Sequence, residues 1–154
     1  MKRIIAILLC LLLFTSGCSS KNTASFYYPR AEFQYNGDSN VIGSEEREVT
    51  GHTAHLSFLI SLYLMGPHNT EFASPFMGSA KLLAVEKSND AMTVRISDTS
   101  NAIADAAFIM DCSCLAMTCF GLTKVHSVTI LSGEKSITLT PELITLYDTV
   151  TQTQ

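Results

Sequence analysis

Basic residues are scarce in this 154-residue chain, which has ten Lys and Arg against fourteen Asp and Glu. Two of the ten, Lys2 and Arg3, lie at the very start, ahead of the part that we expect to fold. The remainder contains no basic cluster and none of the motifs typical of nucleic-acid-binding domains. The composition therefore excludes nucleic acid from the expected partners.

The motifs that mark common catalytic sites are also missing. The chain has no G-x-S-x-G sequence around a nucleophilic serine and no glycine-rich loop for phosphate. Asp105 and Asp111 form a candidate acid pair, but six residues of helix turn the two side chains to different sides. We expect no catalytic residues and no cofactor, and hence a protein that is not an enzyme.

Paired and dispersed cysteines, which usually indicate a disulfide framework in an exported protein, do not occur. Apart from Cys10 and Cys18 near the start, the cysteines are Cys112, Cys114 and Cys119, an odd number within eight residues. On a helix, the first and third of these lie about 10 Å apart and the second points elsewhere. A disulfide requires Cα atoms within about 7 Å. We expect three small buried side chains rather than a disulfide or a site for a soft metal.

The first 18 residues have the order of a bacterial export signal. A basic start is followed by an uninterrupted apolar run over residues 4–14, which is shorter than the roughly 20 residues that span a bilayer. The next four residues, Thr15-Ser16-Gly17-Cys18, resemble the lipobox of bacterial lipoprotein precursors, in which the Cys thiol is lipidated and the signal is removed. The small residues fit this motif, whereas Thr15 replaces the usual Leu. An apolar segment that stays in place as a membrane anchor is the alternative.

This resemblance implies a domain organisation and a location. Residues 1–17 are the expected lipoprotein signal peptide, 18–23 a polar tether, 24–148 a single domain and 149–154 a frayed tail. Removing the signal leaves eight basic against fourteen acidic residues, a net charge of about −6. Two or more acyl chains on Cys18 would hold the protein firmly at the outer face of the cytoplasmic membrane.

Hydrophobic periodicity predicts an α+β fold with a small mixed sheet of three to five strands and two helices packed on one face. Gly66-Pro67 and Gly121 are the expected helix ends, and Thr53 and Asn101 the expected caps. The apolar residues of the second helix lie nearly all round it, so it needs cover on more than one side. The expected elements are strand 24–29, loop 34–48, helix 53–65, an antiparallel hairpin of strands 80–86 and 91–97, helix 102–119, and strands 124–131 and 136–140.

Six segments of the chain share a pattern with one bacterial domain family: Phe26-Tyr27-Tyr28-Pro29, Arg47-Glu48-Val49, Leu59 to Gly66-Pro67, Ser74 to Val85, Thr93 to Ser97 and Lys124 to Gly133. Through these segments, residues from about 24 to 148 resemble the GerMN domain of bacterial spore-formation lipoproteins. The resemblance implies a fold akin to ring-building motifs and a role in spore formation or germination through protein contacts at the envelope, without catalytic residues. The chain lacks a second proline before Gly78, and its second helix is unusually rich in Cys and Met.

Partner-binding candidates are the aromatic residues Tyr27, Tyr28 and Phe33, with Tyr35 nearby, although packing in the core is the alternative use of at least two of them. An exposed sheet edge or the apolar flank of helix 102–119 is the expected contact with envelope or sporulation proteins, or with another copy of the chain. A small-molecule or glycan-binding lipoprotein, with a pocket lined by these aromatics, is the alternative function.

One further motif bears on metal binding. His52 and His55 have a spacing that can present two side chains to zinc. The local sequence offers no third ligand, so we expect no metal site and interpret both residues as solvated side chains of the first helical turn.

Overall fold

The computed structural model describes residues 23–32, 41–49, 55–99 and 103–144. The expected signal peptide, Cys18, Phe33, Tyr35 and the C-terminal tail lie outside these ranges. The elements are strands β1 (Thr23–Pro29) and β2 (Ile42–Glu48), helix α2 (Leu56–Leu64), the 3-10 turn η1 (Pro75–Gly78), strands β3 (Leu82–Ser88) and β4 (Ala91–Ile96), helix α3 (Asp105–Leu122), and strands β5 (Ser127–Ser132) and β6 (Lys135–Leu139).

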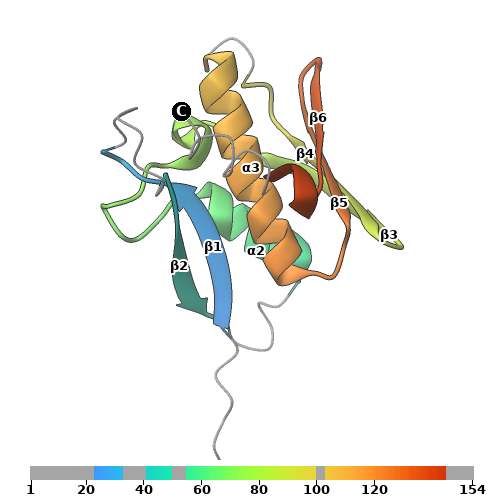
Figure 1. Ribbon diagram of the computed structural model, residues 1–154, viewed down its shortest axis with the longest axis horizontal. Helices are drawn as coiled ribbons and strands as arrows, with labels where there is room; N and C mark the ends of the chain where they lie inside the picture. The colour runs from blue at the N-terminus through green and yellow to red at the C-terminus, as the bar shows by residue number, and fades with distance from the viewer. Residues whose placement is uncertain (1–22, 33–40, 50–54, 100–102, 145–154) are drawn as a thin grey trace, which may run out of the picture.

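The elements form layers, with α2 and α3 lying between a two-stranded ribbon and a four-stranded sheet (Figure 1). The ribbon pairs β1 with β2 in antiparallel register. The sheet has the order β3-β4-β5-β6, in which only β4 and β5 run parallel. The predicted α+β class and mixed sheet are therefore confirmed, as is the antiparallel hairpin of β3 and β4. The prediction did not separate the first strand from this sheet.

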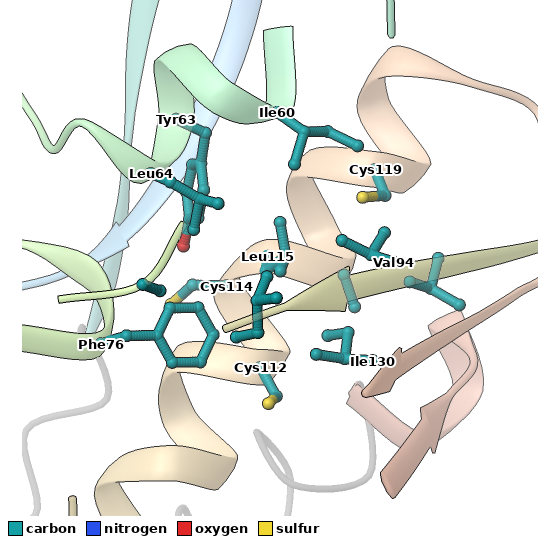
Figure 2. Packing of buried hydrophobic residues seen from close by; sticks show 14 of the residues in the cluster. Ile60, Tyr63, Leu64, Phe76, Val94, Cys112, Cys114, Leu115, Cys119 and Ile130 are labelled. Carbon is teal, nitrogen blue, oxygen red and sulfur yellow. The ribbon is translucent and has the colours of Figure 1, made fainter. Parts of the chain in front are cut away.

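Helix α3 is apolar nearly all round because it is covered on two sides. It contacts β1 on one side and both β5 and β6 on the other. Figure 2 shows Leu115 and Cys112 of this helix facing Val94 and Ile130 of the sheet. The helix is long and apolar enough to cross a membrane by length and composition alone, but nine of its residues are buried inside the fold. We interpret it as the central core helix.

The second strand was not predicted, and the expectation of a loop over 34–48 is wrong for residues 42–48. Strand β2 reads IGSEERE, which has no alternation of apolar side chains, so no periodic signal marks it. Its inward positions are taken by a buried Arg47 and a partly buried Glu45, and its outward ones by exposed polar residues. Pairing with β1, not hydrophobic pattern, therefore determines this strand.

The two predicted glycine stops have different outcomes. Gly66 has a φ of 98° and follows the last turn of α2, which confirms the first stop. Gly121 lies inside α3, so the second prediction is wrong. The helix ends one residue later, at Leu122, where the backbone N–H and the hydroxyl of the following Thr123 both donate to the Cys119 carbonyl, at 3.0 Å and 2.8 Å. The expected caps Thr53 and Asn101 lie outside the described residues.

Thr118 fixes the ribbon to the core helix. Its Oγ1 accepts a hydrogen bond from the backbone N–H of Tyr27 at 3.0 Å and donates one to the Cys114 carbonyl at 3.0 Å. On the inward face of β1, Phe26 and Tyr28 are fully buried. Strand β1 is therefore held both by its buried side chains and by a backbone hydrogen bond on the edge that does not pair with β2.

Candidate functional site

Two methionines are the most exposed large hydrophobic residues in the described part of the chain. Met65, directly after α2, is 82% exposed, and Met77, in η1, is 72% exposed. Ser74 lies between the two segments: a Cβ atom placed on Gly66 would be 3.0 Å from its Oγ, and one placed on Gly78 would be 3.9 Å from its Cβ. The backbone segments that carry the two methionines are therefore neighbours.

Helix α2 extends this apolar area. Phe58, Leu62 and Met65 are spaced by four and three residues, which places them on one face of the helix and its last turn. Phe58 is 46% exposed and Leu62 is half-buried, whereas the opposite face of the helix packs into the core. We call Phe58, Leu62, Met65 and Met77 the methionine surface.

Arg47 holds the Met65 side of this surface. Its buried guanidinium donates to the Gly66 carbonyl at 2.7 Å and to the Leu62 carbonyl at 3.5 Å. These carbonyls lie at the C-terminal end of α2, where a cationic side chain is favourable. The guanidinium carbon also lies 5.0 Å from the centroid of the Phe26 ring. The end of α2 is thus fixed by one charged side chain that reaches it from β2.

Glu45 completes the contact between β2 and the loop after α2. Its carboxylate forms a short ion pair with Arg47 and accepts hydrogen bonds from the backbone N–H groups of His68 and Asn69, at 2.9 Å and 2.8 Å. Partial burial opposes ionisation, but the bonds from Asn69, Arg47 and His68 together hold the pKa of Glu45 below its usual value. We call Glu45 and Arg47 the Arg47 clasp.

The Met77 side is held in an uncommon backbone conformation. Phe76 and Met77 have φ values of 50° and 54°, in the left-handed region that costs a residue with a side chain about 1–2 kcal/mol. The buried Phe76 ring packs against Phe108 with centroids 6.0 Å apart, and the hydroxyl of Ser79 donates to the Phe76 carbonyl. Non-glycine residues persist in this conformation only where surrounding contacts enforce it.

Asp111 of α3 supplies the second fixed contact. Its Oδ2 accepts a hydrogen bond from the backbone N–H of Phe76 at 2.8 Å. Burial raises the pKa of Asp111 to about 6, although the bond from Phe76 lowers it. Within the described part of the chain the neighbouring Tyr63 hydroxyl is buried without a hydrogen-bond partner, and Figure 2 shows its ring directed toward the Cys114 region of α3. One buried side chain, Arg47 or Asp111, thus forms a hydrogen bond with the backbone of the residue next to each exposed methionine.

The pKa of Asp111 predicts a pH dependence. Because the folded pKa lies above the ordinary value of 3.8, the folded state binds more protons than the unfolded state between about pH 4 and 6. The Asp111 carboxyl therefore contributes most to the stability of the folded state below pH 4, and this contribution is lost as the pH rises through 6. We expect Asp111→Asn, which keeps an acceptor for Phe76, to be more stable than wild type at pH 7 by up to about 3 kcal/mol.

Urea unfolding at several pH values measures this effect. The stability difference between Asp111→Asn and wild type should grow from pH 4 to pH 6 and then stay constant. Carboxyls with lowered pKa values, such as Glu45 and Asp105, make the free energy of unfolding rise with pH in both proteins. Subtracting the wild-type value from that of the variant removes this shared dependence. A difference that does not vary with pH would contradict the assignment.

The predicted aromatic contacts lie on two different faces of the ribbon. Tyr28 is fully buried, stacks on Tyr63 with ring centroids 4.8 Å apart and donates its hydroxyl proton to the Tyr63 carbonyl. The prediction that Tyr28 contacts a partner is therefore wrong, because alternation along β1 turns it inward. Tyr27 faces outward and is half-buried beside Gly121, while Phe33 lies outside the described residues.

The flank of α3 is not the exposed apolar surface that we expected. Both of its long sides are covered, and within residues 105–122 only Ile109, at 40%, counts as an exposed large hydrophobic residue. Three of the six exposed large hydrophobic residues in the described part of the chain, Phe58, Met65 and Met77, lie instead on α2, directly after it and in η1. The sequence indicated turns there, through Gly66-Pro67 and Gly78, but not that the intervening methionines would point outward.

The remaining candidates behave as packing or surface residues. Cys112, Cys114 and Cys119 are free and buried, and burial raises the pKa of each thiol, that of Cys119 to about 12. The expectation of three buried hydrophobic side chains is confirmed. Asp105 is exposed and pairs with Lys135 at 2.8 Å, whereas Asp111 is buried, so the two carboxyls do not form one site.

The histidine motif is only partly described. His55 is exposed and precedes α2, and His52 lies outside the described residues. Across residues 23–32, 41–49, 55–99 and 103–144, no three His, Cys, Asp or Glu side chains are grouped so that they could hold a metal ion.

Comparison with known proteins gives one structural likeness. No protein-family model matches the chain, and no curated protein matches it. A crystal structure described as a "Putative Lipoprotein from Clostridium perfringens" is 16% identical, with a TM-score of 0.48, and the match covers 79% of this chain and 88% of that one. A likeness this distant assigns no function, so the GerMN resemblance and the lipid anchor remain predictions.

Proposed function

We propose that this protein is an extracytoplasmic lipoprotein whose domain binds another protein of the cell envelope through the methionine surface. Cys18 supports the location, because it follows a basic start and an apolar run of signal-peptide length. Strand β1 begins at Thr23, five positions later. Five residues reach at most about 18 Å, so an acylated Cys18 would hold the start of β1 within that distance of the bilayer.

The observation that carries the binding proposal is the fixed display of Met65 and Met77. Methionine side chains are flexible and polarisable, and they recur at surfaces that adapt to an apolar partner. Here the backbone beneath them is held by Arg47 and Asp111, so little backbone order would be lost on binding. The expected partner presents apolar side chains, and envelope proteins or another copy of the chain are the candidates.

We propose a role in spore formation or germination, through protein contacts, on the resemblance to GerMN domains alone. No reaction is proposed. The alternative of a small-molecule or glycan-binding lipoprotein loses one of its three expected lining residues, because Tyr28 is part of the core.

Crosslinking in the living cell tests the methionine surface. A tagged full-length protein should capture a partner, and Met65→Lys combined with Met77→Lys should reduce the captured partner by about tenfold or more, since each buried ammonium opposes apolar contact. Leu83→Lys is the matched control, because Leu83 is also apolar and 61% exposed but lies on β3.

Both variants should unfold at the same urea concentration as wild type, because none of the three substituted positions is buried. Equal capture by the double variant and the control would overturn the assignment of the surface. Failure of the wild-type protein to capture any envelope protein or copy of itself would overturn the function.

A further inference from the structure

The methionines that follow the expected signal peptide differ sharply in exposure. Met65 is 82% exposed and Met77 72%, whereas Met92 is 1% exposed in the core. Met110 and Met117 of α3 are half-buried. A dissolved oxidant attacks a methionine thioether from solvent, so reactivity increases with exposure. Met65 and Met77 are therefore the methionines that such an oxidant reaches first.

The cysteines of the core do not compete for the same oxidant. Cys112, Cys114 and Cys119 are buried, and burial raises the pKa of each thiol, that of Cys119 to about 12. Peroxide attacks the thiolate and not the thiol, and thiols with pKa values this high stay protonated at neutral pH. Within the described part of the chain, the exposed thioethers are thus the sulfur atoms open to oxidation.

Oxidation by hydrogen peroxide changes the chemical character of these side chains. A lone pair of the thioether sulfur attacks one peroxide oxygen, and the S–O bond forms as the O–O bond breaks. Sulfur loses two electrons, peroxide gains them, and the second oxygen leaves as water with both peroxide protons. The sulfoxide that results is polar and accepts hydrogen bonds, whereas the thioether is apolar.

The fold confines this change to the surface. The carbonyl of the residue after Met65 accepts a hydrogen bond from Arg47. The N–H of the residue before Met77 donates one to Asp111. Neither bond involves a methionine sulfur, so sulfoxide at both positions leaves α2 and η1 in place. At the buried Met92 it would instead bring a polar group into the core.

We propose that Met65 and Met77 form an oxidation-sensitive site, at which conversion to methionine sulfoxide by peroxide outside the cytoplasm releases the protein partner. The inference rests on the proposed function, because it requires the methionine surface to be the docking surface. A sulfoxide oxygen held against apolar side chains loses its hydrogen bonds to water, which lowers the affinity. The change is reversible, since methionine sulfoxide reductases restore the thioether.

Peptide mapping by mass spectrometry tests the chemistry of the site. In the folded full-length protein treated with hydrogen peroxide, Met65 and Met77 should be oxidised at least about tenfold faster than Met92. The three core cysteines should remain unmodified thiols. The oxidised protein should unfold at the same urea concentration as the untreated protein, because the added oxygens are exposed.

Crosslinking to untreated envelope membranes tests the effect on docking. Purified full-length protein is oxidised, freed of peroxide and then added, so that the partner never meets the oxidant. Oxidised wild type should capture the partner about tenfold or more less than untreated wild type.

Two double variants separate oxidation of this site from oxidation elsewhere. Met65→Leu with Met77→Leu keeps apolar side chains of similar volume without sulfur, so it should capture the partner equally with and without peroxide treatment. Met65→Gln with Met77→Gln is polar throughout and should capture little even when untreated.

Three results would contradict the inference. The first is oxidation of Met92, Met110 or Met117 ahead of Met65 and Met77. The second is equal capture by oxidised and untreated wild type, which leaves the proposed function standing. The third is a loss of capture on oxidation that is as large in the double leucine variant as in wild type. Absence of capture by the untreated wild type would remove the proposed function as well.

Discussion

Replacement of Cys18 by Ser should move the protein from the membrane fraction to the soluble fraction almost completely. A single acyl chain binds membranes only marginally, with an association constant of roughly 10⁴ M⁻¹, whereas two or more chains hold a protein stably. The serine variant has no thiol to acylate, so it should lose every chain. Fractionation of cells followed by immunoblotting measures the result.

Mass spectrometry of the mature N-terminus supplies the direct check. The wild-type protein should begin at an acylated Cys18, and Ser19→Ala, which changes the neighbouring residue, should remain acylated and in the membrane. A wild-type protein without acyl groups at Cys18, or a serine variant that still carries them, would refute the anchor.

Replacement of Arg47 by Ala should lower the free energy of unfolding by about 3–5 kcal/mol, the usual cost of removing one partner of a buried ion pair. The substitution leaves Glu45 without its main counter-charge and leaves the Gly66 carbonyl without its donor. It also removes the guanidinium that lies over the Phe26 ring. The loss arises from several contacts of the Arg47 clasp at once, so Arg47→Lys should recover only part of it.

Urea unfolding measures the loss, and Arg95→Ala is the matched control. Arg95 is an exposed arginine on β4, where a truncation should change stability by no more than about 0.5 kcal/mol. A loss below about 1 kcal/mol in Arg47→Ala would show that the clasp is not a major source of stability. A weakened capture of the partner by Arg47→Lys would further tie the clasp to the display of Met65.

Elements with their own periodic signal were predictable from the sequence. The hairpin of β3 and β4 and the core helix α3 follow from apolar spacing, and the all-round apolar character of α3 correctly indicated cover on more than one side. Strand β2 was missed because its charged sequence gains its conformation from β1. Its Arg47, which lies in the range expected to be a loop, is buried through contacts with segments up to 21 positions away.

The methionine surface could not be predicted for a related reason. A left-handed backbone is normally signalled by glycine, but at Phe76 and Met77 it occurs in residues with side chains, next to contacts with Asp111 and Phe108 that are more than 30 positions away. The assignment of Tyr27 and Tyr28 to one patch failed because the alternation of a strand separates neighbours, and only the packed structure shows which of the two faces the core.

The bond between Tyr27 and Thr118 spans 91 positions of the chain, and this separation constrains the order of assembly. A polypeptide that crosses the membrane with its N-terminus first would deliver β1 long before α3 arrives to cover it. Until then Phe26 and Tyr28 have no complete core to enter, so they are exposed to aggregation or to a holding chaperone. Closure of such distant contacts is also slow. Acylation near the N-terminus would therefore have time to occur on a chain that is still open.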